Sequence, residues 1–468
     1  MAGMVPSLSF VGGTLVLEGE DRDARERLFP STPWVWDSRA GVWRCDAREY
    51  AVIRSQLDRF VRPFDDRVPQ WRPVRWPHVR IHSLRPEQEA AVAAWQKTRQ
   101  GVIVMPTGTG KTEVALRIMA DAGLAALVVA PVRDLMYHWH RRILETLGYD
   151  AGIIGDNVFR VRPVSVTTYD SAYIHMERLG DQFALVVFDE CHHLPGPMRR
   201  DAARMSVAPM RLGLTATPER SDSRHLDLDW LIGPVVYQMP LSDARGQTLA
   251  DYEVTRIPIH LVPEQQSRYD QLAQEVRRYI IERRKTEPQY SWKDLCNESG
   301  KTPEARRAMR AYYAKKSIED RAEEKLRVLE GLFRLHVGEP CLVFAGSNAM
   351  ARDVSRRFLI PCLLNHCGKK ERLEVLRGLE DGTYPALVAN QVLDEGVDLP
   401  EVKVAVVIGG TGSSRQAKQR LGRVLRKSGN ARAVLYEVVC ADTTEEHRSR
   451  RRRKSDAYEG TRHRREPK

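Results

Sequence analysis

The chain has 468 residues and a mass of 53.4 kDa, too long for one compact core, so two or three domains are expected. With 42% hydrophobic and 29% charged residues, it has the composition of a soluble protein, and no apolar run approaches the roughly 20 residues that cross a bilayer. The net charge is +12, of which residues 448–468 contribute +7 through ten Lys and Arg against three Asp and Glu.

This basic tail admits two interpretations, which are compatible. It can hold a polyanion such as nucleic acid through counterion release, or it can be a solvated, disordered end. The seven cysteines are scattered and lack zinc-like paired spacing, which predicts free thiols rather than disulfides, a zinc site or an iron–sulfur cluster. The N-terminus has no secretory pattern, so we expect a cytoplasmic protein, associated with the nucleoid if prokaryotic.

The first segment, residues 1–77, mixes short β-like runs with a helix. Residues 8–17 predict two strands around a Gly-Gly turn, and 34–44 predict another hairpin. Residues 47–60 are typical of a helix, and a proline-rich linker follows. We therefore expect a small mixed α/β N-terminal domain.

From Leu84 a different pattern begins, with a predicted helix over 84–100 and then apolar runs that alternate with amphipathic ones. Continuous apolar strands alternating with helices predict parallel sheets covered on both faces. The first set of expected strands is 102–105, 126–130, 164–168, 185–188 and 212–215. The second set is 341–345, 362–365, 386–389, 404–408 and 433–437. A charged block over 263–321 predicts a projecting helical insertion between the two.

The segment Met105–Thr112, MPTGTGKT, follows an apolar strand and precedes a predicted helix over 113–121. This is the context of a phosphate-binding loop. Its glycines, Gly108 and Gly110, let successive backbone N–H groups face a polyphosphate at a helix N-terminus. Lys111 can reach the β- and γ-phosphates, and the Thr112 hydroxyl can ligate Mg²⁺.

A second chemical signal is the apolar strand 185–188, which ends in the carboxylates Asp189 and Glu190. At a strand end of a doubly wound sheet, an Asp can hold Mg²⁺ and the neighbouring Glu can polarise a water. The alternative is a surface pair that caps the strand. We expect His192 and His193 to point to opposite faces of an extended segment and not to share a metal ion.

Far downstream, residues 419–426 place three arginines at intervals of three, so a helix would present them on one face. Positive charge that arrives on lobe closure can stabilise a transferred phosphoryl group. A basic exposed face, or a nucleic-acid stripe, explains the same spacing.

Together these segments resemble superfamily 2 helicases, and within them the xeroderma pigmentosum group B (XPB) family in its short prokaryotic form. The shared superfamily segments are 84–88, 106–112, 189–192, 214–218 and 419–423. The signals closer to XPB are 167–172, 192–195 and 390–400. The resemblance runs over nearly the whole chain up to the tail.

The resemblance implies an α/β fold: two RecA-like parallel-sheet lobes, a small N-terminal domain and a helical thumb-like insertion, with ATP and Mg²⁺ bound between the lobes. The implied domains are 1–77 (damage-recognition-like), 78–245 (first lobe), 246–330 (connector and thumb), 331–447 (second lobe) and 448–468 (disordered basic tail).

Site roles follow from the same resemblance. Lys111, Asp189, Glu190, Arg423 and Arg426 would be catalytic, Arg423 and Arg426 as arginine fingers. Thr112 and Asp189 would hold Mg²⁺. The nucleotide would be bound by Arg85, Gln88 (at the adenine), Thr107, Gly108, Thr109, Gly110, Lys111, Thr112, Gly396, Asp398 and Gln419. Hydrolysis would be coupled to motion by His192, Thr215, Ala216 and Thr217.

The sequence departs from the family at one place. The Arg-Glu-Asp element that opens the duplex is represented by Arg220-Ser221-Asp222, which makes strand separation a weaker prediction than ATP hydrolysis or translocation. The leading hypothesis is a 3′–5′ ATP-driven DNA helicase in nucleotide excision repair or transcription, acting on single-stranded or forked DNA as a monomer. Alternatives are a duplex translocase without unwinding, a DNA-binding scaffold for a nuclease partner, and an RNA helicase.

Overall fold

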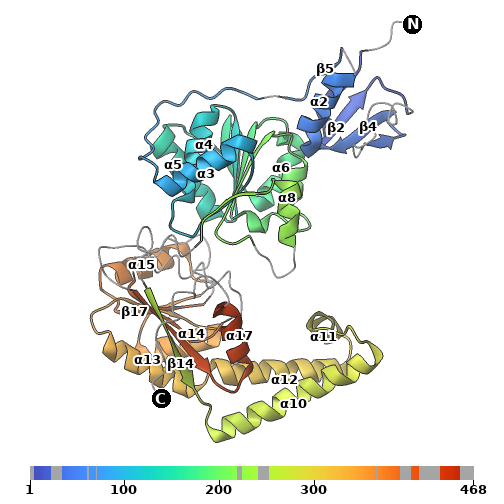
Figure 1. Ribbon diagram of the computed structural model, residues 1–468. Helices are drawn as coiled ribbons and strands as arrows, with labels where there is room; N and C mark the ends of the chain where they lie inside the picture. Colours follow the sequence, from blue (N-terminus) through green and yellow to red (C-terminus); the bar gives the residue numbers. More distant parts are fainter. Residues whose placement is uncertain are drawn as a thin grey trace. The chain divides into compact units, whose positions relative to one another are not determined.

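The computed structural model describes residues 5–22, 34–60, 63–69, 71–218, 224–240, 252–364, 366–390, 402–410 and 433–453 (Figure 1). The chain forms two compact units, Met1–Leu241 and Ser242–Lys468. Among the described residues, every helix is too short or too polar to span a membrane.

The N-terminal part of the first unit is a five-stranded sheet with one helix. Its strands are β1 (Ser7–Val11), β2 (Thr14–Glu18), β3 (Val35–Asp37), β4 (Val42–Asp46) and β5 (Asp65–Asp66), in the order β3-β4-β2-β1-β5. Both expected hairpins are confirmed, and Gly12 and Gly13 turn the first one at positive φ. The short η1 (Ala47–Glu49) leads into helix α2 (Tyr50–Phe60), as expected.

This small sheet packs against the rest of the first unit. Arg204 forms a two-pronged ion pair with Asp46, at 2.9 and 3.1 Å. The side chain of Val207 is buried in the hydrophobic core of the N-terminal sheet. A Cβ on Gly13 would lie 2.8 Å from Met205 Cγ. The N-terminal sheet and the segment 204–207 are therefore closely packed, through apolar contacts as well as an ion pair.

An eight-stranded sheet forms the body of the first unit. Its order is β13-β6-β12-β11-β7-β10-β8-β9, with all neighbours parallel except the hairpin β8–β9. The five expected strands are confirmed as β6 (Gln100–Val104), β7 (Ala126–Ala130), β10 (Val164–Thr168), β11 (Leu185–Asp189) and β12 (Met210–Thr215). The additional strands β8 (Gly152–Gly155), β9 (Val158–Arg160) and β13 (Val235–Gln238) extend the sheet at its edges.

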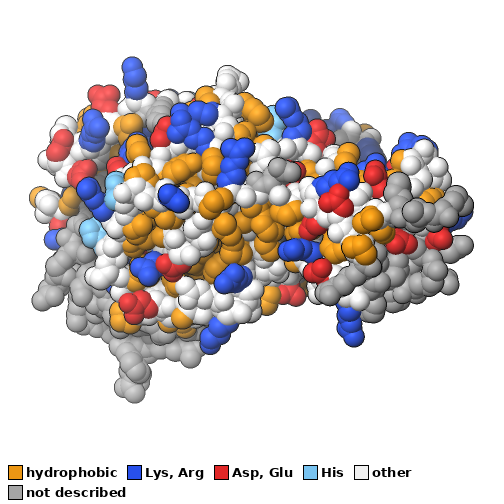
Figure 2. Space-filling view, turned by 90° about the horizontal axis from the view of Figure 1, so that it is seen from above, with side chains coloured by type: hydrophobic (Ala, Val, Ile, Leu, Met, Phe, Trp, Pro, Cys, Tyr) orange, Lys and Arg blue, Asp and Glu red, His pale blue; other side chains and the backbone are white. Residues whose placement is uncertain are grey.

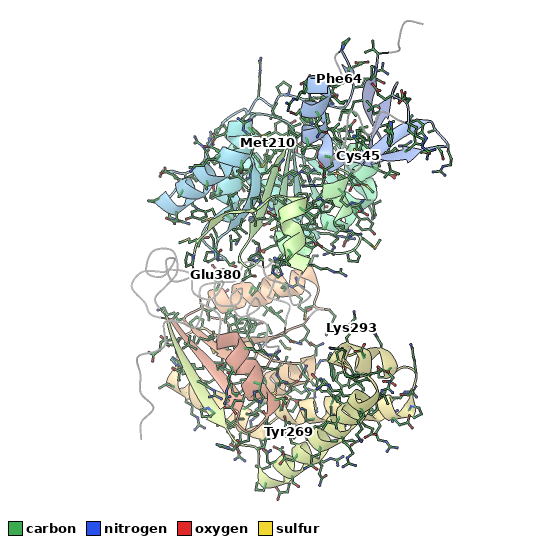
Figure 3. All side chains as sticks on the ribbon, turned by 45° about the vertical axis from the view of Figure 1, so that its right-hand side comes forward. Cys45, Phe64, Met210, Tyr269, Lys293 and Glu380 are labelled. Carbon is green, nitrogen blue, oxygen red and sulfur yellow. The ribbon has the colours of Figure 1, made fainter. Side chains whose placement is uncertain are left out.

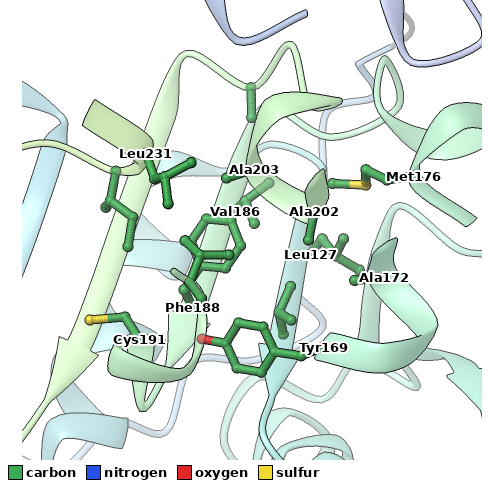
Figure 4. Close-up of a cluster of buried hydrophobic side chains, with 14 of the residues drawn as sticks. Leu127, Tyr169, Ala172, Met176, Val186, Phe188, Cys191, Ala202, Ala203 and Leu231 are labelled. Carbon is green, nitrogen blue, oxygen red and sulfur yellow. The ribbon is translucent and has the colours of Figure 1, made fainter. Parts of the chain in front are cut away.

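Helices cover both faces of this sheet, as expected for buried parallel strands (Figure 1). One face carries α3 (Pro86–Thr98), α4 (Lys111–Ala122) and α5 (Arg133–Leu147). The other carries α6 (Tyr169–Leu179), α7 (Asp201–Arg204) and α8 (Asp227–Leu231). Figure 4 shows the core beneath this second face, where Tyr169, Val186, Phe188 and Leu231 are fully buried.

A buried arginine joins three elements of this unit. The guanidinium of Arg211, at the start of β12, is 2% exposed and donates to the carbonyl oxygens of Ala203, Ser206, Ala208 and Leu231. Burial lowers the pKa of Arg211 to about 9, so the group stays charged at neutral pH. Its donors satisfy carbonyls that would otherwise be buried without partners.

We expect Arg211→Met to lower the free energy of unfolding by about 3 kcal/mol, because several buried carbonyls lose their donor. Arg211→Lys should be almost as harmful, since an ammonium cannot present the same planar set of donors. Urea denaturation of the full chain, followed by tryptophan fluorescence, measures the effect. The exposed Arg117→Met on α4 is the control, and equal midpoints for the two Met variants would contradict the prediction.

The second unit contains a six-stranded, all-parallel sheet of order β14-β19-β18-β15-β17-β16. The five expected strands are confirmed as β15 (Cys341–Phe344), β16 (Cys362–Leu363), β17 (Ala386–Ala389), β18 (Val404–Val407) and β19 (Ala433–Cys440). The sixth, β14 (Tyr252–Ile259), lies within residues expected to be a connector, and that expectation was wrong. β14 pairs with β19 over its full length, although the two strands are far apart in the sequence.

The expected helical insertion is confirmed as α10 (Pro263–Thr286), α11 (Trp292–Glu298) and α12 (Pro303–Asp320), followed by α13 (Glu323–Leu335). The long helices α10 and α12 pack along each other to form an arm, with α11 at its far end (Figure 1). Tyr269 lies near the root of the arm and Lys293 near its tip (Figure 3). Tyr269 also belongs to the core of the second sheet, so the arm is rooted in that core.

The expectation of a disordered tail from residue 448 was wrong for its first residues. Helix α17 spans Thr444–Arg453, and Arg448 within it forms an ion pair with the fully buried Glu319 of α12. A second buried ion pair joins Lys325 of α13 to Glu445 of α17, at 2.8 Å. The two buried ion pairs hold α17 against α12 at the root of the arm and against α13. The number of charges in the segment did not predict these contacts. Residues 454–468 lie outside the described part of the chain.

Candidate functional site

Three segments of the first unit end at the same edge of its sheet. Strand β12 lies between β6 and β11, with Thr215 opposite Val104 and Leu214 opposite Asp189. The phosphate-loop candidate therefore leaves β6 beside Thr215, and the acidic pair leaves β11 on the other side. Carboxyl ends of parallel strands are where ligands bind in such sheets.

The loop after β6 has the geometry of an anion cradle. Gly108 and Gly110 have φ of +86° and +81°, and α4 begins directly after Gly110. The Lys111 ammonium donates to the carbonyl oxygens of Met105 (3.1 Å) and Pro106 (3.4 Å), so it folds back over its own loop. The Thr109 hydroxyl donates to Pro106 O at 2.7 Å and closes the turn. Backbone N–H groups at a helix N-terminus and one lysine thus gather at one point.

Gln88 and Arg85 brace this loop from α3 and its preceding residue. Gln88 is 3% exposed; its Nε2 donates to Thr109 O at 3.0 Å, while its Oε1 accepts from Arg85 N at 2.9 Å. The Arg85 guanidinium donates to the same Thr109 carbonyl. Gly110 has a φ of +81°, which residues with a side chain rarely adopt, and a Cβ there would also crowd Gln88 Nε2. Gln88 therefore supports the loop, and its expected contact with adenine stays a prediction.

Asp189 is partly buried, and its carboxylate accepts hydrogen bonds from two donors. Its Oδ2 accepts from Trp139 Nε1 at 2.8 Å, and its Oδ1 accepts from Glu190 N at 3.0 Å. Burial raises the pKa of Asp189, against the opposing effects of the Trp139 hydrogen bond and the positive charge of Lys111. The Lys111 charge acting on Asp189 links the phosphate loop to the acidic pair.

The residues after Asp189 do not form the extended segment that we expected. Glu190 adopts a left-handed conformation (φ +47°), and 191–193 form a short 3₁₀ turn, η2, which brings the rings of His192 and His193 to 4.3 Å. The expectation that the two rings face opposite ways was wrong, because a tight turn replaces the alternation of a strand. Among the described residues, no cluster of three metal-ligating side chains occurs.

A chain of polar contacts runs from the acidic pair to Thr215. His192, fully buried, has Nδ1 3.4 Å from Glu190 Oε2 and 3.0 Å from Thr215 Oγ1. The Thr215 hydroxyl donates to Thr217 O and accepts from Thr217 N, both at 3.1 Å. Because the hydroxyl hydrogen is used, His192 Nδ1 is the donor to Thr215. Met105 N donates to Thr215 O at 3.0 Å, which connects the chain to the phosphate loop.

The residues present fit a bound polyphosphate and a divalent cation. Within the described part of the chain, the buried oxygens Thr107 Oγ1, Thr217 Oγ1 and Glu190 Oε2 accept or donate no hydrogen bond. All three belong to segments that end at this edge, where a ligand or its waters can satisfy them. Hydroxyl and carboxylate oxygens are the donors that Mg²⁺ prefers.

Several predicted site residues lie outside the described residues. They are Arg220, Asp222, Gly396, Asp398, Gln419, Arg423 and Arg426. The arginine fingers and the duplex-opening residues therefore stay predictions. By contrast, Trp139 contacts the site and was not predicted, because a buried tryptophan in an amphipathic helix is usually a core residue.

Three family models match the chain. Residues 8–68 match the xeroderma pigmentosum group B helicase damage recognition domain, 81–220 match the res subunit of type III restriction enzymes, and 324–428 match the helicase conserved C-terminal domain. The order and extent of these matches agree with the N-terminal sheet and the two parallel sheets.

Solved structures and curated relatives agree with this assignment. The helicase domain of Hef from Pyrococcus furiosus has the same fold (TM-score 0.54, 16% identity, 77% of this chain and 97% of that one). The DNA 3′-5′ translocase XPB2 of Sulfurisphaera tokodaii is 40% identical over 79% of this chain and 84% of its own. The DNA 3′-5′ helicase XPB of Kineococcus radiotolerans is 30% identical over 81% of this chain, which spans 63% of that relative's length. On the strength of the damage-recognition and helicase matches and the 40% identity, this chain belongs to the XPB family of superfamily 2 helicases.

Proposed function

We propose that this chain is an ATP-driven motor that moves 3′–5′ on DNA and serves DNA repair or transcription. The observation that carries the proposal is the convergence of the phosphate loop, the acidic pair and the Thr215 segment at neighbouring strand ends of one sheet. Relatives named as a DNA 3′-5′ translocase and a DNA 3′-5′ helicase support the polymer and the direction.

Each group of the first unit has a defined part in hydrolysis. The N–H groups of 107–112 and the Lys111 ammonium bind the phosphates and offset their charge. Thr112 and Asp189 would hold Mg²⁺, which neutralises charge that develops on the phosphoryl oxygens. Glu190, whose Oε2 is buried without a hydrogen bond from the described residues, orients the attacking water. From the family resemblance we also propose that Arg423 and Arg426 act as arginine fingers, and that Gly396, Asp398 and Gln419 bind the nucleotide.

The coupling route follows the contacts around His192. When the γ-phosphate leaves, Glu190 loses a partner, and His192 lies between Glu190 and Thr215. Thr215 holds both Thr217 and the first residue of the phosphate loop. A shift at the acidic pair therefore reaches Thr215, Ala216 and Thr217, from which the chain continues to Arg220 and Asp222.

The helical arm supplies a surface for the sugar–phosphate backbone. On α12, the exposed residues Arg306, Arg310 and Tyr313 recur at intervals of four and three, so they share one face. Trp292 of α11 is 41% exposed and its ring lies 4.1 Å from that of Tyr312. Guanidinium groups beside exposed rings suit sequence-independent binding to phosphates and bases.

The face of the molecule drawn in Figure 2 shows Lys and Arg scattered among hydrophobic side chains rather than gathered in one patch. The arm and the lobes therefore account for DNA binding better than net charge alone. We propose the domain limits 1–77, 78–245, 246–330, 331–447 and 448–468, with β14 assigned to the second sheet and 448–453 to α17. We also propose a cytoplasmic, monomeric protein that works at single-stranded or forked DNA and can pair with a nuclease.

The test compares ATP turnover in the presence of matched DNA and RNA strands, beside a forked-duplex assay and a duplex translocation assay. We expect DNA to stimulate turnover more strongly than RNA, because the relatives are named as a DNA translocase and a DNA helicase. Stimulation without strand separation would favour the duplex translocase, in keeping with Ser221 in the duplex-opening element. Equal or greater stimulation by RNA would overturn the choice of DNA, and absent turnover would favour a scaffold for a nuclease.

A further inference from the structure

The acidic residue of the ATPase centre is held by a side chain from a neighbouring helix. Trp139, in the middle of α5, is 1% exposed, and its indole N–H donates to Asp189 Oδ2 at 2.8 Å. The other carboxylate oxygen is bonded to Glu190 N within the same turn. Trp139 is thus the side-chain donor that fixes the rotation of the Asp189 carboxylate.

A second aromatic residue holds the same turn through its backbone. Tyr169, the first residue of α6, is fully buried and donates its hydroxyl to Asp189 O at 3.0 Å. Its ring stacks on Phe188 at 6.3 Å, and Figure 4 shows it beside Phe188 and Cys191 in the core. Helices α5 and α6 lie on opposite faces of the sheet, so Trp139 and Tyr169 hold the turn from opposite sides (Figure 1).

The contacts of Trp139 and Tyr169 stabilise a strained turn. Glu190 has a positive φ, which is strained for a residue with a side chain and persists only where the surroundings impose it. A carboxylate can also rotate easily about its last torsion angle. Tyr169 fixes the backbone of the turn, and Trp139 fixes the carboxylate of Asp189. Asp189 Oδ1 accepts one hydrogen bond, from Glu190 N, and can accept further partners.

We propose that Trp139 is a positioning residue of the ATPase centre, which orients Asp189 so that it binds the nucleotide-associated Mg²⁺, with Tyr169 holding the backbone of the same turn. This inference rests on the proposed role of Asp189. Partners that orient a metal-binding carboxylate without touching the metal change metal affinity by about 10- to 100-fold when they are removed. The indole therefore acts on the nucleotide through the Asp189 carboxylate.

The test measures binding of a fluorescent ADP to the full chain, with Mg²⁺ and with EDTA. We expect Trp139→Phe to weaken Mg²⁺-dependent binding about tenfold or more and to leave the binding in EDTA unchanged. Tyr169→Phe should weaken it less, because the carboxylate keeps both of its own bonds. The half-saturating Mg²⁺ concentration for ATP turnover should rise in parallel.

The chain supplies matched controls for each substitution. Trp95 is 3% exposed and its indole donates to Arg211 O at 2.9 Å, so Trp95→Phe removes an equivalent buried bond away from the site. Tyr50, buried and bonded to Asp66 at 2.7 Å, serves in the same way for Tyr169. Equal loss of binding in Mg²⁺ and EDTA, or no loss with Trp139→Phe, would overturn the proposal.

One further variant separates this inference from the proposed function. Asp189→Asn should abolish the Mg²⁺ dependence of binding if Asp189 holds the metal. If Asp189→Asn acts so and Trp139→Phe does not, only the positioning role fails. If neither changes the Mg²⁺ dependence, the assignment of Asp189 itself is wrong and the positioning role falls with it.

Discussion

Replacing Lys111 by Ala should reduce DNA-stimulated ATP turnover by about 100- to 1000-fold, the loss expected when one fixed charge at a transferring phosphoryl group is removed. Lys111 already lies at the phosphate loop, where its ammonium donates to the carbonyls of Met105 and Pro106, and its charge acts on Asp189. No other lysine occurs in the segment 105–112. Steady-state phosphate release with saturating DNA measures the effect.

DNA affinity should stay close to that of the parent, because the phosphate loop and the arm belong to different units of the chain. Lys97→Ala, at an exposed position of α3, controls for the loss of a positive charge from the same unit. Turnover of Lys111→Ala at the parental rate would show that the nucleotide binds elsewhere. A parallel loss of DNA affinity would mean that the substitution has disturbed the fold.

Replacing Lys325 by Met should lower the free energy of unfolding of the second unit by about 3–5 kcal/mol, because it leaves a charged partner buried and unpaired. Lys325 and Glu445 are both fully buried; the ammonium lies 2.8 and 2.9 Å from the two carboxylate oxygens, and one of those oxygens also accepts from Cys440 N. Burial disfavours the charged lysine, but the charge and hydrogen bonds of Glu445, together with smaller effects of groups such as Asp320, outweigh burial and raise the pKa of Lys325. Urea denaturation of the full chain measures the change.

The double variant Lys325→Met/Glu445→Met should recover much of the lost stability, since a buried ion pair replaced by apolar groups of similar size is often neutral. The exposed ion pair of Arg334 with Glu330 on α13 is the control, and Arg334→Ala should cost no more than about 1 kcal/mol. A single variant as stable as the parent would show that Glu445 finds water or another partner. A double variant as unstable as the single would assign the loss to packing rather than charge.

Local patterns predicted the conformation of the loop after β6 and of the end of β11 closely. The phosphate loop and the strand that ends in Asp189 and Glu190 depend on neighbours in sequence: glycines that permit positive φ, a lysine at a helix start, and an apolar run before two acids. The conformation of such segments is set by residues close together in the sequence, so the spacing of residue types is enough to identify them. The limits of β7, β10 and β17 agree with the predicted limits for the same reason.

Contacts between distant residues could not be predicted in this way. β14 is a strand because β19, far away in the chain, offers it a parallel edge. Arg448 is one of many arginines in its segment, and only the fold places it against the buried Glu319. His192 and His193 lie side by side because the chain turns after Glu190, where an alternating strand was expected.

The family resemblance and the two parallel sheets were evident from the amino-acid sequence alone, because short motifs and periodic apolar runs specify them. The same motifs predict which residues of the first unit bind the nucleotide. Only the folded chain shows how those residues are held. Trp139 bonds to Asp189, Gln88 bonds to the phosphate loop, and His192 lies between Glu190 and Thr215. The physical reason is that burial and hydrogen bonding join side chains from separate helices and strands, and no local pattern records which partners will meet.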